Sequence, residues 1–176
     1  MKNPCLVIID VQEKLFPVIS EKESFLKNLV VLIKGFQLFD LPIIVTEQVP
    51  EKLGNTISQV SSLFDNMEPI TKSSFSCVGE PKFKRSMDLI NPNEIILTGI
   101  ETHVCVYQTT KDLLKQNRHV EVITDAVSSR KHDNHAVALQ RMNKEGAGLN
   151  TVEMMLFSMQ EKAKGDTFKK LVRLVK

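Results

Sequence analysis

Asp10, Lys72 and Cys105 have side chains that suit one reaction, although they lie far apart in a chain of 176 residues. A cysteine thiolate is a nucleophile, and an aspartate can take the thiol proton and later return it to a leaving amine. A lysine ammonium close to both groups stabilises the thiolate and the carboxylate. The three residue types therefore predict hydrolysis by covalent catalysis at a cysteine.

Each of these residues also has a purely structural explanation. Asp10 can cap a loop or a helix, Lys72 can be a solvated lysine, and a buried cysteine such as Cys105 often packs as a small hydrophobe. The prediction of a site rests on all three coming together, so it depends on the elements that carry them.

Short apolar runs rich in β-branched residues predict the strands, because strands of a parallel sheet are buried on both faces and are almost continuously apolar. Two weaker runs complete a set of six. The four clear runs and then the two weaker ones lie at 5–10, 42–47, 94–99 and 120–126, and at 68–75 and 147–152.

Apolar residues at helical spacing fill the segments between these runs. Helices are predicted to begin near Ser24, near Thr102 and at Asp133 as N-cap, and a last helix over 168–175 packs either on the domain or on a second subunit. This alternation predicts a three-layer α/β/α fold with a central, mainly parallel six-stranded sheet, as one domain over residues 1–176.

The carboxyl ends of the strands are the expected place for a ligand, because loops converge there in open parallel sheets. Asp10 and Lys72 end two of the predicted strands, and Cys105 follows the strand that ends at Gly99. A helix N-terminus and Lys72 would both favour a thiolate at Cys105. We therefore expect Asp10→Ala and Lys72→Ala to slow the alkylation of Cys105 without unfolding the protein.

Composition and charge exclude several classes of protein. A hydrophobic fraction of 42% and a charged fraction of 25% are ordinary for a globular protein, and a net charge of +2 argues against a nucleic-acid partner. No apolar run reaches the ~18 residues of a membrane helix, and the N-terminus lacks the features of a secretory signal. Cys5, Cys77 and Cys105 are widely spaced and form no CxxC pair, which indicates reduced thiols and a cytoplasmic location.

Three segments, "VIIDVQ", "ITKSSFS" and "GIETHVCVYQT", resemble the isochorismatase-like cysteine hydrolase superfamily. Two others, "TEQVPEKLGNT" and "DAVSSR", resemble its metal-free branch, the isochorismatase domain-containing proteins. The resemblance covers essentially the whole chain and implies a catalytic triad of Asp10, Lys72 and Cys105. It also implies a homo-oligomer, either a dimer or a tetramer.

The same resemblance assigns roles to the turn before the cysteine. It implies a cis peptide bond between Ile100 and Glu101, and an oxyanion hole formed by the backbone N–H groups of Glu101 and Cys105. We further predict that the substrate pocket is lined by Phe16, Phe75, Ile100 and His103, with core packing as the alternative for the two phenylalanines.

No metal ion and no cofactor are predicted. Nicotinamidase-like members of the superfamily carry metal-binding histidines after the second strand, whereas residues 46–50 read Thr-Glu-Gln-Val-Pro. This departure also argues against nicotinamide as the substrate. His132 and His135 have a spacing typical of metal ligands on a helix, but a polar helix start explains them better.

The leading hypothesis is a cofactor-independent hydrolase of a C–N, amide-type bond in a small molecule, acting through a thioester. The alternative is a non-catalytic oligomeric binding or scaffold protein that retains the fold. A nucleotide-binding domain is disfavoured because "DVQEKLF" after the first strand contains no glycine, and only the basic segment "FKKLVRLVK" favours ribonuclease-like activity. Cys77 is interpreted as a cysteine without function, with a redox role left open.

Overall fold

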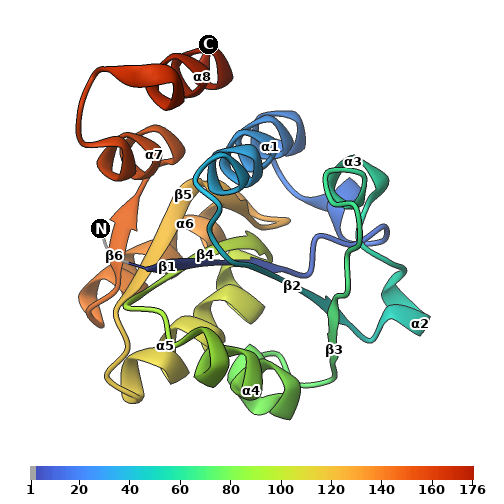
Figure 1. Ribbon diagram of the computed structural model, residues 1–176. Helices are drawn as coiled ribbons and strands as arrows, with labels where there is room; N and C mark the ends of the chain where they lie inside the picture. Colours follow the sequence, from blue (N-terminus) through green and yellow to red (C-terminus); the bar gives the residue numbers. More distant parts are fainter. Residues whose placement is uncertain (1–2) are drawn as a thin grey trace.

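The computed structural model describes residues 3–176 and contains one six-stranded sheet (Figure 1). Its strand order is β3-β2-β1-β4-β5-β6, and every neighbouring pair is parallel. The predicted sheet is therefore confirmed, both weaker runs included. The strands are β1 (Pro4–Ile9), β2 (Ile43–Gln48), β3 (Ile70–Lys72), β4 (Glu94–Ile100), β5 (Val120–Ser128) and β6 (Gly148–Asn150).

Helices cover both faces of this sheet, which confirms the three-layer architecture (Figure 1). Helices α1, α7 and α8 lie on one face, and α4, α5 and α6 lie on the other. The helices are α1 (Lys22–Leu38), α2 (Pro50–Leu53), α3 (Ser58–Ser61), α4 (Pro81–Ile90), α5 (Tyr107–Lys115), α6 (His132–Lys144), α7 (Val152–Gln160) and α8 (Gly165–Val175).

The central strands separate two hydrophobic clusters. In β1, Leu6 and Ile8 belong to the cluster under α1, whereas Cys5, Val7 and Ile9 belong to the cluster over α4, α5 and α6. All five side chains are fully buried. Successive side chains of a strand point to opposite faces, so a strand covered on both faces must be apolar throughout, as this one is.

Three helical details differ from the predictions or complete them. Helix α6 begins with Lys131 at its N-cap rather than Asp133, which lies in the first turn, where its negative charge suits the helix dipole. Helices α4 and α7 were not predicted, although Phe83, Met87 and Ile90 of α4 lie at helical spacing; α7 is apolar on most of its surface and so shows no clear helical period. Helix α8 packs on the domain through the fully buried Leu171, in the cluster that contains α1 and α7.

The strand register brings the ends of β1, β2, β3 and β4 together. Ile9 pairs with Thr46 on one side and Gly99 on the other, and Gln48 pairs with Lys72. Gly99 has a φ of +115°, and a Cβ atom there would collide with the backbone of Ile9. Glycine is therefore required where β4 passes closest to β1. Within residues 3–176 no helix is both long enough and apolar enough to cross a membrane.

Candidate active site at the carboxyl edge of the sheet

A buried ion pair lies at the carboxyl edge of the sheet. Lys72 Nζ is 2.7 Å from Asp10 Oδ2, and both side chains are fully enclosed. The ammonium group also donates to Gln48 Oε1 at 2.7 Å and to the carbonyl oxygens of Ser74 and Phe75 at 3.3 and 3.2 Å. Since an ammonium has only three hydrogens, protein oxygens already use them all. Lys72 is thus placed to hold Asp10 and the loop after β3.

The two carboxylate oxygens of Asp10 have different partners. Oδ2 faces Lys72, whereas Oδ1 accepts a hydrogen bond of 2.8 Å from the hydroxyl of Thr46 in β2. The backbone N–H of Asp10 donates to the carbonyl of Thr46 at 3.2 Å. The carboxylate is therefore fixed from two neighbouring strands, and its orientation does not depend on solvent.

A pair of glutamine amides supports this arrangement. Gln12 Oε1 accepts the backbone N–H of Gln48 at 2.8 Å, and Gln12 Nε2 donates to the carbonyls of Gln48 and Gly54 at 3.0 and 2.6 Å. Gln48 Nε2 donates to the carbonyl of Ser73 at 2.8 Å, which leaves its Oε1 for Lys72. The loops after β1, β2 and β3 are joined into one buried network.

Cys105 lies in a single π-helical turn, Thr102–Val106, that leads from β4 into α5. The peptide bond between Ile100 and Glu101 is cis, as predicted. The carbonyl of Glu101 accepts the backbone N–H groups of Val104 and Val106. The side chain of Cys105 is only slightly exposed, at 5% for the residue, and packs in the same cluster as Ile9.

The electrostatic environment of Cys105 favours the protonated thiol. Burial is the largest cause that raises the pKa of its thiol well above the ordinary range, and the carboxylate of Asp10 raises this pKa further by its charge and as a hydrogen-bond acceptor. Lys72 lowers the pKa of Cys105, but less. Burial and Asp10 thus favour the thiol form of Cys105, against the expectation of a resting thiolate.

Lys72 keeps its own proton. Burial lowers its pKa, but Asp10 and the two nearby cysteines, Cys77 and Cys105, raise the pKa by more, so the net direction is upward. The substitutions of Lys72 and Asp10 are consequently expected to change the alkylation rate of Cys105 in opposite directions. Removing Lys72 should slow the alkylation of Cys105, as expected, whereas removing the negative charge of Asp10 should speed it, contrary to the expectation from the sequence.

Glu101 is anchored by Arg130, a residue whose role the sequence did not suggest. Glu101 Oε2 accepts the backbone N–H of Arg130 at 2.9 Å and its Nε at 3.1 Å. Glu101 is buried, and the guanidinium of Arg130 is largely exposed. This contact fixes the turn that precedes Cys105. The oxyanion hole itself stays a prediction.

The four predicted pocket residues differ in their burial. Ile100 is fully buried in the core cluster of α1, and Phe16 is half-buried, with its ring centroid 6.3 Å from that of Phe25. Ile100 thus serves the core, and for Phe16 the core-packing alternative is supported; the lining of a substrate pocket by these residues stays a prediction. Phe75 is 53% exposed beside Lys72. His103 lines a mainly apolar pocket of about 220 Å³ with Tyr107, Asp133, Asn134, Val137, Ala138 and Arg141.

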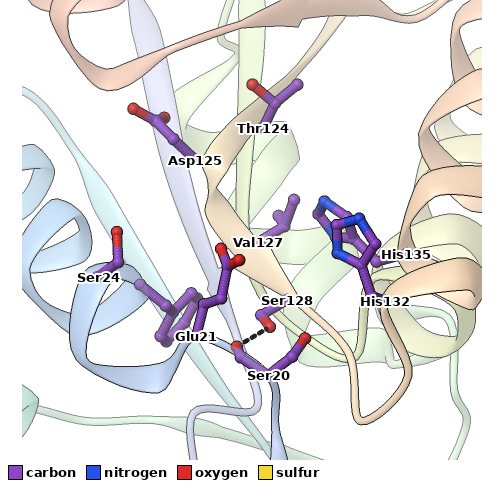
Figure 2. A pocket seen from close by; sticks show the side chains of 10 residues that line it. Ser20, Glu21, Ser24, Thr124, Asp125, Val127, Ser128, His132 and His135 are labelled. Carbon is purple, nitrogen blue, oxygen red and sulfur yellow. Dashed lines mark hydrogen bonds between the residues drawn. The ribbon is translucent and has the colours of Figure 1, made fainter.

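A second pocket, of about 100 Å³, lies at the end of β5, between the starts of α1 and α6 (Figure 2). Figure 2 shows the rings of His132 and His135 side by side, with the carboxylates of Glu21 and Asp125 across the pocket. His135 Nδ1 is 3.0 Å from the hydroxyl of Thr102. Burial, and then His132, lower the pKa of His135, which favours a neutral ring.

His135 therefore joins the start of α6 to the turn that carries Cys105. Over the described residues, 3–176, no three His, Cys, Asp or Glu side chains are arranged to hold a metal ion. The absence of a metal in the working protein stays a prediction.

A parallel α/β/α sheet with these features has the fold of isochorismatase-like hydrolases. The chain belongs to the isochorismatase family, since the Isochorismatase domain matches residues 4–154. It is 33% identical over 174 residues to isochorismatase domain-containing protein 2 from Danio rerio. The aligned region covers 99% of this chain and 87% of that relative. The resemblance inferred from the sequence motifs is thereby confirmed.

Two solved structures have the same fold. The MAR1 ribonuclease from Caenorhabditis elegans matches with a TM-score of 0.92 and 33% identity, over 98% of this chain and 89% of that one. The YcaC gene product from Escherichia coli, described as an octameric hydrolase of unknown specificity, matches with a TM-score of 0.91 over 98% of this chain and 87% of that one. At 20% identity, the second likeness concerns the fold alone. Family membership supports a hydrolase.

Proposed function

We propose that this protein is a cysteine-dependent hydrolase that cleaves a C–N, amide-type bond in a small molecule through a thioester. The observation that carries the proposal is the buried Asp10–Lys72 ion pair. The carboxylate of this pair raises the pKa of the Cys105 thiol by its charge and as a hydrogen-bond acceptor. A buried charge pair is costly to retain, and perturbed ionisable groups cluster at functional sites. Family membership supports the hydrolase class.

In the first half of the reaction, Cys105 Sγ attacks the substrate carbonyl carbon while its proton passes to Asp10. Because burial and Asp10 favour the thiol form of Cys105, this transfer accompanies the attack and does not precede it. Lys72 keeps its three hydrogens on protein oxygens and acts by holding Asp10 in position. The backbone N–H groups of Glu101 and Cys105 stabilise the oxyanion.

In the second half, the tetrahedral intermediate collapses and the C–N bond breaks. Asp10 returns the proton to the leaving amine, and an acyl thioester remains on Cys105. Asp10 then takes a proton from a water molecule that attacks the thioester carbonyl carbon. The second collapse releases the carboxylic acid and returns a proton to the Cys105 sulfur.

The test is a panel of small amides, esters and ureido compounds, with rapid-quench mass spectrometry of the intact protein. We expect one or more amides to leave an acyl group on Cys105, followed by steady release of the acid. Cys105→Ser should abolish both signals, while Cys5→Ser, a substitution at the opposite edge of the sheet, should retain them. Turnover that survives Cys105→Ser would contradict the proposal.

We also propose that the protein works as a homo-oligomer. The octameric description of the E. coli YcaC product supports an oligomer in this fold but fixes no number of subunits here. Light scattering of the full chain tests this point. If an oligomer forms while no compound of the panel is hydrolysed, the non-catalytic binding or scaffold alternative is favoured.

Ribonuclease activity is a second candidate, favoured by the printed name of the C. elegans structure at 33% identity. The exposed basic residues of α8 are the surface of this chain that suits RNA. Cleavage of a labelled RNA that fails in Cys105→Ser would place this activity at the same site. Cleavage that persists in Cys105→Ser would indicate a contaminant or a different site.

A further inference from the structure

Cys77, which the proposed mechanism does not use, lies next to the candidate site. Its Sγ is 3.9 Å from the hydroxyl oxygen of Thr46, and Thr46 donates from that hydroxyl to Asp10. The side chain of Cys77 is fully buried, in the same apolar cluster as Cys105. The first contact path between the two cysteines therefore runs through Asp10.

A second path runs through α5. The backbone N–H of Cys77 donates to Thr109 Oγ1 at 3.0 Å. Thr109 lies four residues after Cys105, so the two side chains share one side of the helix. Two independent contacts thus bring Cys77 to the site that contains Cys105, and the charge of an ionised Cys77 raises the pKa of Cys105.

The charges agree with this placement. Cys77 and Cys105 both contribute to the raised pKa of Lys72, and Lys72 lowers the pKa of both thiols. One ammonium group therefore acts on two sulfur atoms. Cys5, the third free cysteine, lies at the start of β1, and burial alone raises the pKa of its thiol to about 12.

We propose that Cys77 is a resolving cysteine, which captures oxidised Cys105 in an intramolecular disulfide and so stops the hydrolase reversibly. The inference rests on the proposed function in one respect, because it takes Cys105 to be the reactive thiol. It assigns a role to Cys77, which the hydrolytic mechanism leaves unexplained.

The chemistry needs a hydroperoxide as oxidant. Cys105 sulfur attacks the peroxide, the O–O bond breaks, one oxygen stays on the sulfur as a sulfenic acid, and the other leaves as water or an alcohol. Cys77 sulfur then attacks the sulfenic sulfur, the S–O bond breaks, and the hydroxide leaves as water with the proton of Cys77. A dithiol reductant returns two electrons and restores both thiols.

The experiment treats the full reduced chain with a few equivalents of hydrogen peroxide and maps the peptides without reduction. We expect a linked pair of peptides that contain Cys77 and Cys105, and recovery of alkylatable Cys105 after dithiothreitol. Cys5→Ser is the matched control and should behave as the unmodified chain does. In Cys77→Ser we expect irreversible loss of Cys105 to sulfinic and sulfonic acids. Cys77→Ala is the second variant, because it avoids a buried hydroxyl.

Two outcomes would overturn the inference. One is the absence of the linked peptide while Cys105 is oxidised, and the other is equal irreversible loss of Cys105 with and without Cys77. Hydrolysis by the reduced protein is measured separately. Turnover without the disulfide leaves the hydrolase standing and refutes this inference. The disulfide without turnover supports Cys77 as the resolving cysteine but refutes the hydrolase, and with it the inhibition.

Discussion

The two edges of the sheet are equally well packed but chemically different. At the amino edge, Cys5 is fully buried and its thiol donates to the carbonyl of Leu6. The side chains of Asn3 and Arg118 at this edge donate to backbone carbonyls near the surface. At the carboxyl edge, Asp10 and Lys72 carry their charges at 0% and 2% exposure. The polar side chains of the amino edge lie where water can reach them, whereas the charged side chains of the carboxyl edge are buried.

This difference indicates which edge has been shaped by a reaction. A buried ion pair adds little stability compared with apolar residues of similar size, and breaking it costs much more. The network of Gln12, Gln48 and Thr46 around the pair is thus better explained by positioning than by folding. Burial alone raises the pKa of Cys5, whereas nearby charges also act on Cys105, so the neighbours of a cysteine distinguish a site from a core.

Lys72→Met should have the largest effect, because it breaks the buried pair while keeping most of the side-chain volume. Asp10 would be left enclosed with Thr46 as its remaining side-chain partner, and we expect the free energy of unfolding at neutral pH to fall by about 3–5 kcal/mol. Alkylation of Cys105 should also become slower. Urea denaturation and pH-resolved alkylation measure the two effects, and an unchanged unfolding curve would contradict the importance of the pair.

Asp10→Asn should separate thiol ionisation from catalysis. The amide keeps the size of the side chain but removes the charge that raises the pKa of Cys105, so alkylation near neutral pH should become faster. Acylation by a substrate should slow by about 100-fold or more, because the general base is lost. Parallel loss of both reactivities would mean that Asp10 supports the fold of the site and does not act as its base.

The sequence was sufficient to predict the sheet and the three residues of the proposed triad, but not what surrounds them. Strands β3 and β6 have only three residues each, so their apolar signal is weak. The contacts of Gln48 and Arg130 depend on strand register and loop geometry, which no local pattern encodes. The effect of burial on the pKa of Cys105 could not be predicted locally, because burial is a property of the whole fold.

The pH dependence of stability should reveal the cysteine of the amino edge. Burial raises the pKa of Cys5 from 9.0 to about 12, so the folded protein keeps a proton that the unfolded chain loses. The contribution of the protonated Cys5 thiol to the free energy of unfolding is complete below pH 9. As the pH rises from 9 towards 12, this contribution falls by about 1.4 kcal/mol per pH unit. Cys5→Ala should make the decline shallower by this amount. An equal slope in both proteins would show that Cys5 ionises normally when folded.

Arg118→Ala should have the smallest effect and completes the comparison at the amino edge. The guanidinium is half-buried and donates from one nitrogen to the carbonyl of Pro92 at 2.9 Å. The loss of this bond should lower the free energy of unfolding by about 1 kcal/mol, because water replaces the lost donor in part. The pH profile of Cys105 alkylation should not move, since the substitution lies at the opposite ends of the strands. A shifted profile would mean that the two edges are coupled through the sheet, and that the carboxyl edge does not set the reactivity of Cys105 alone.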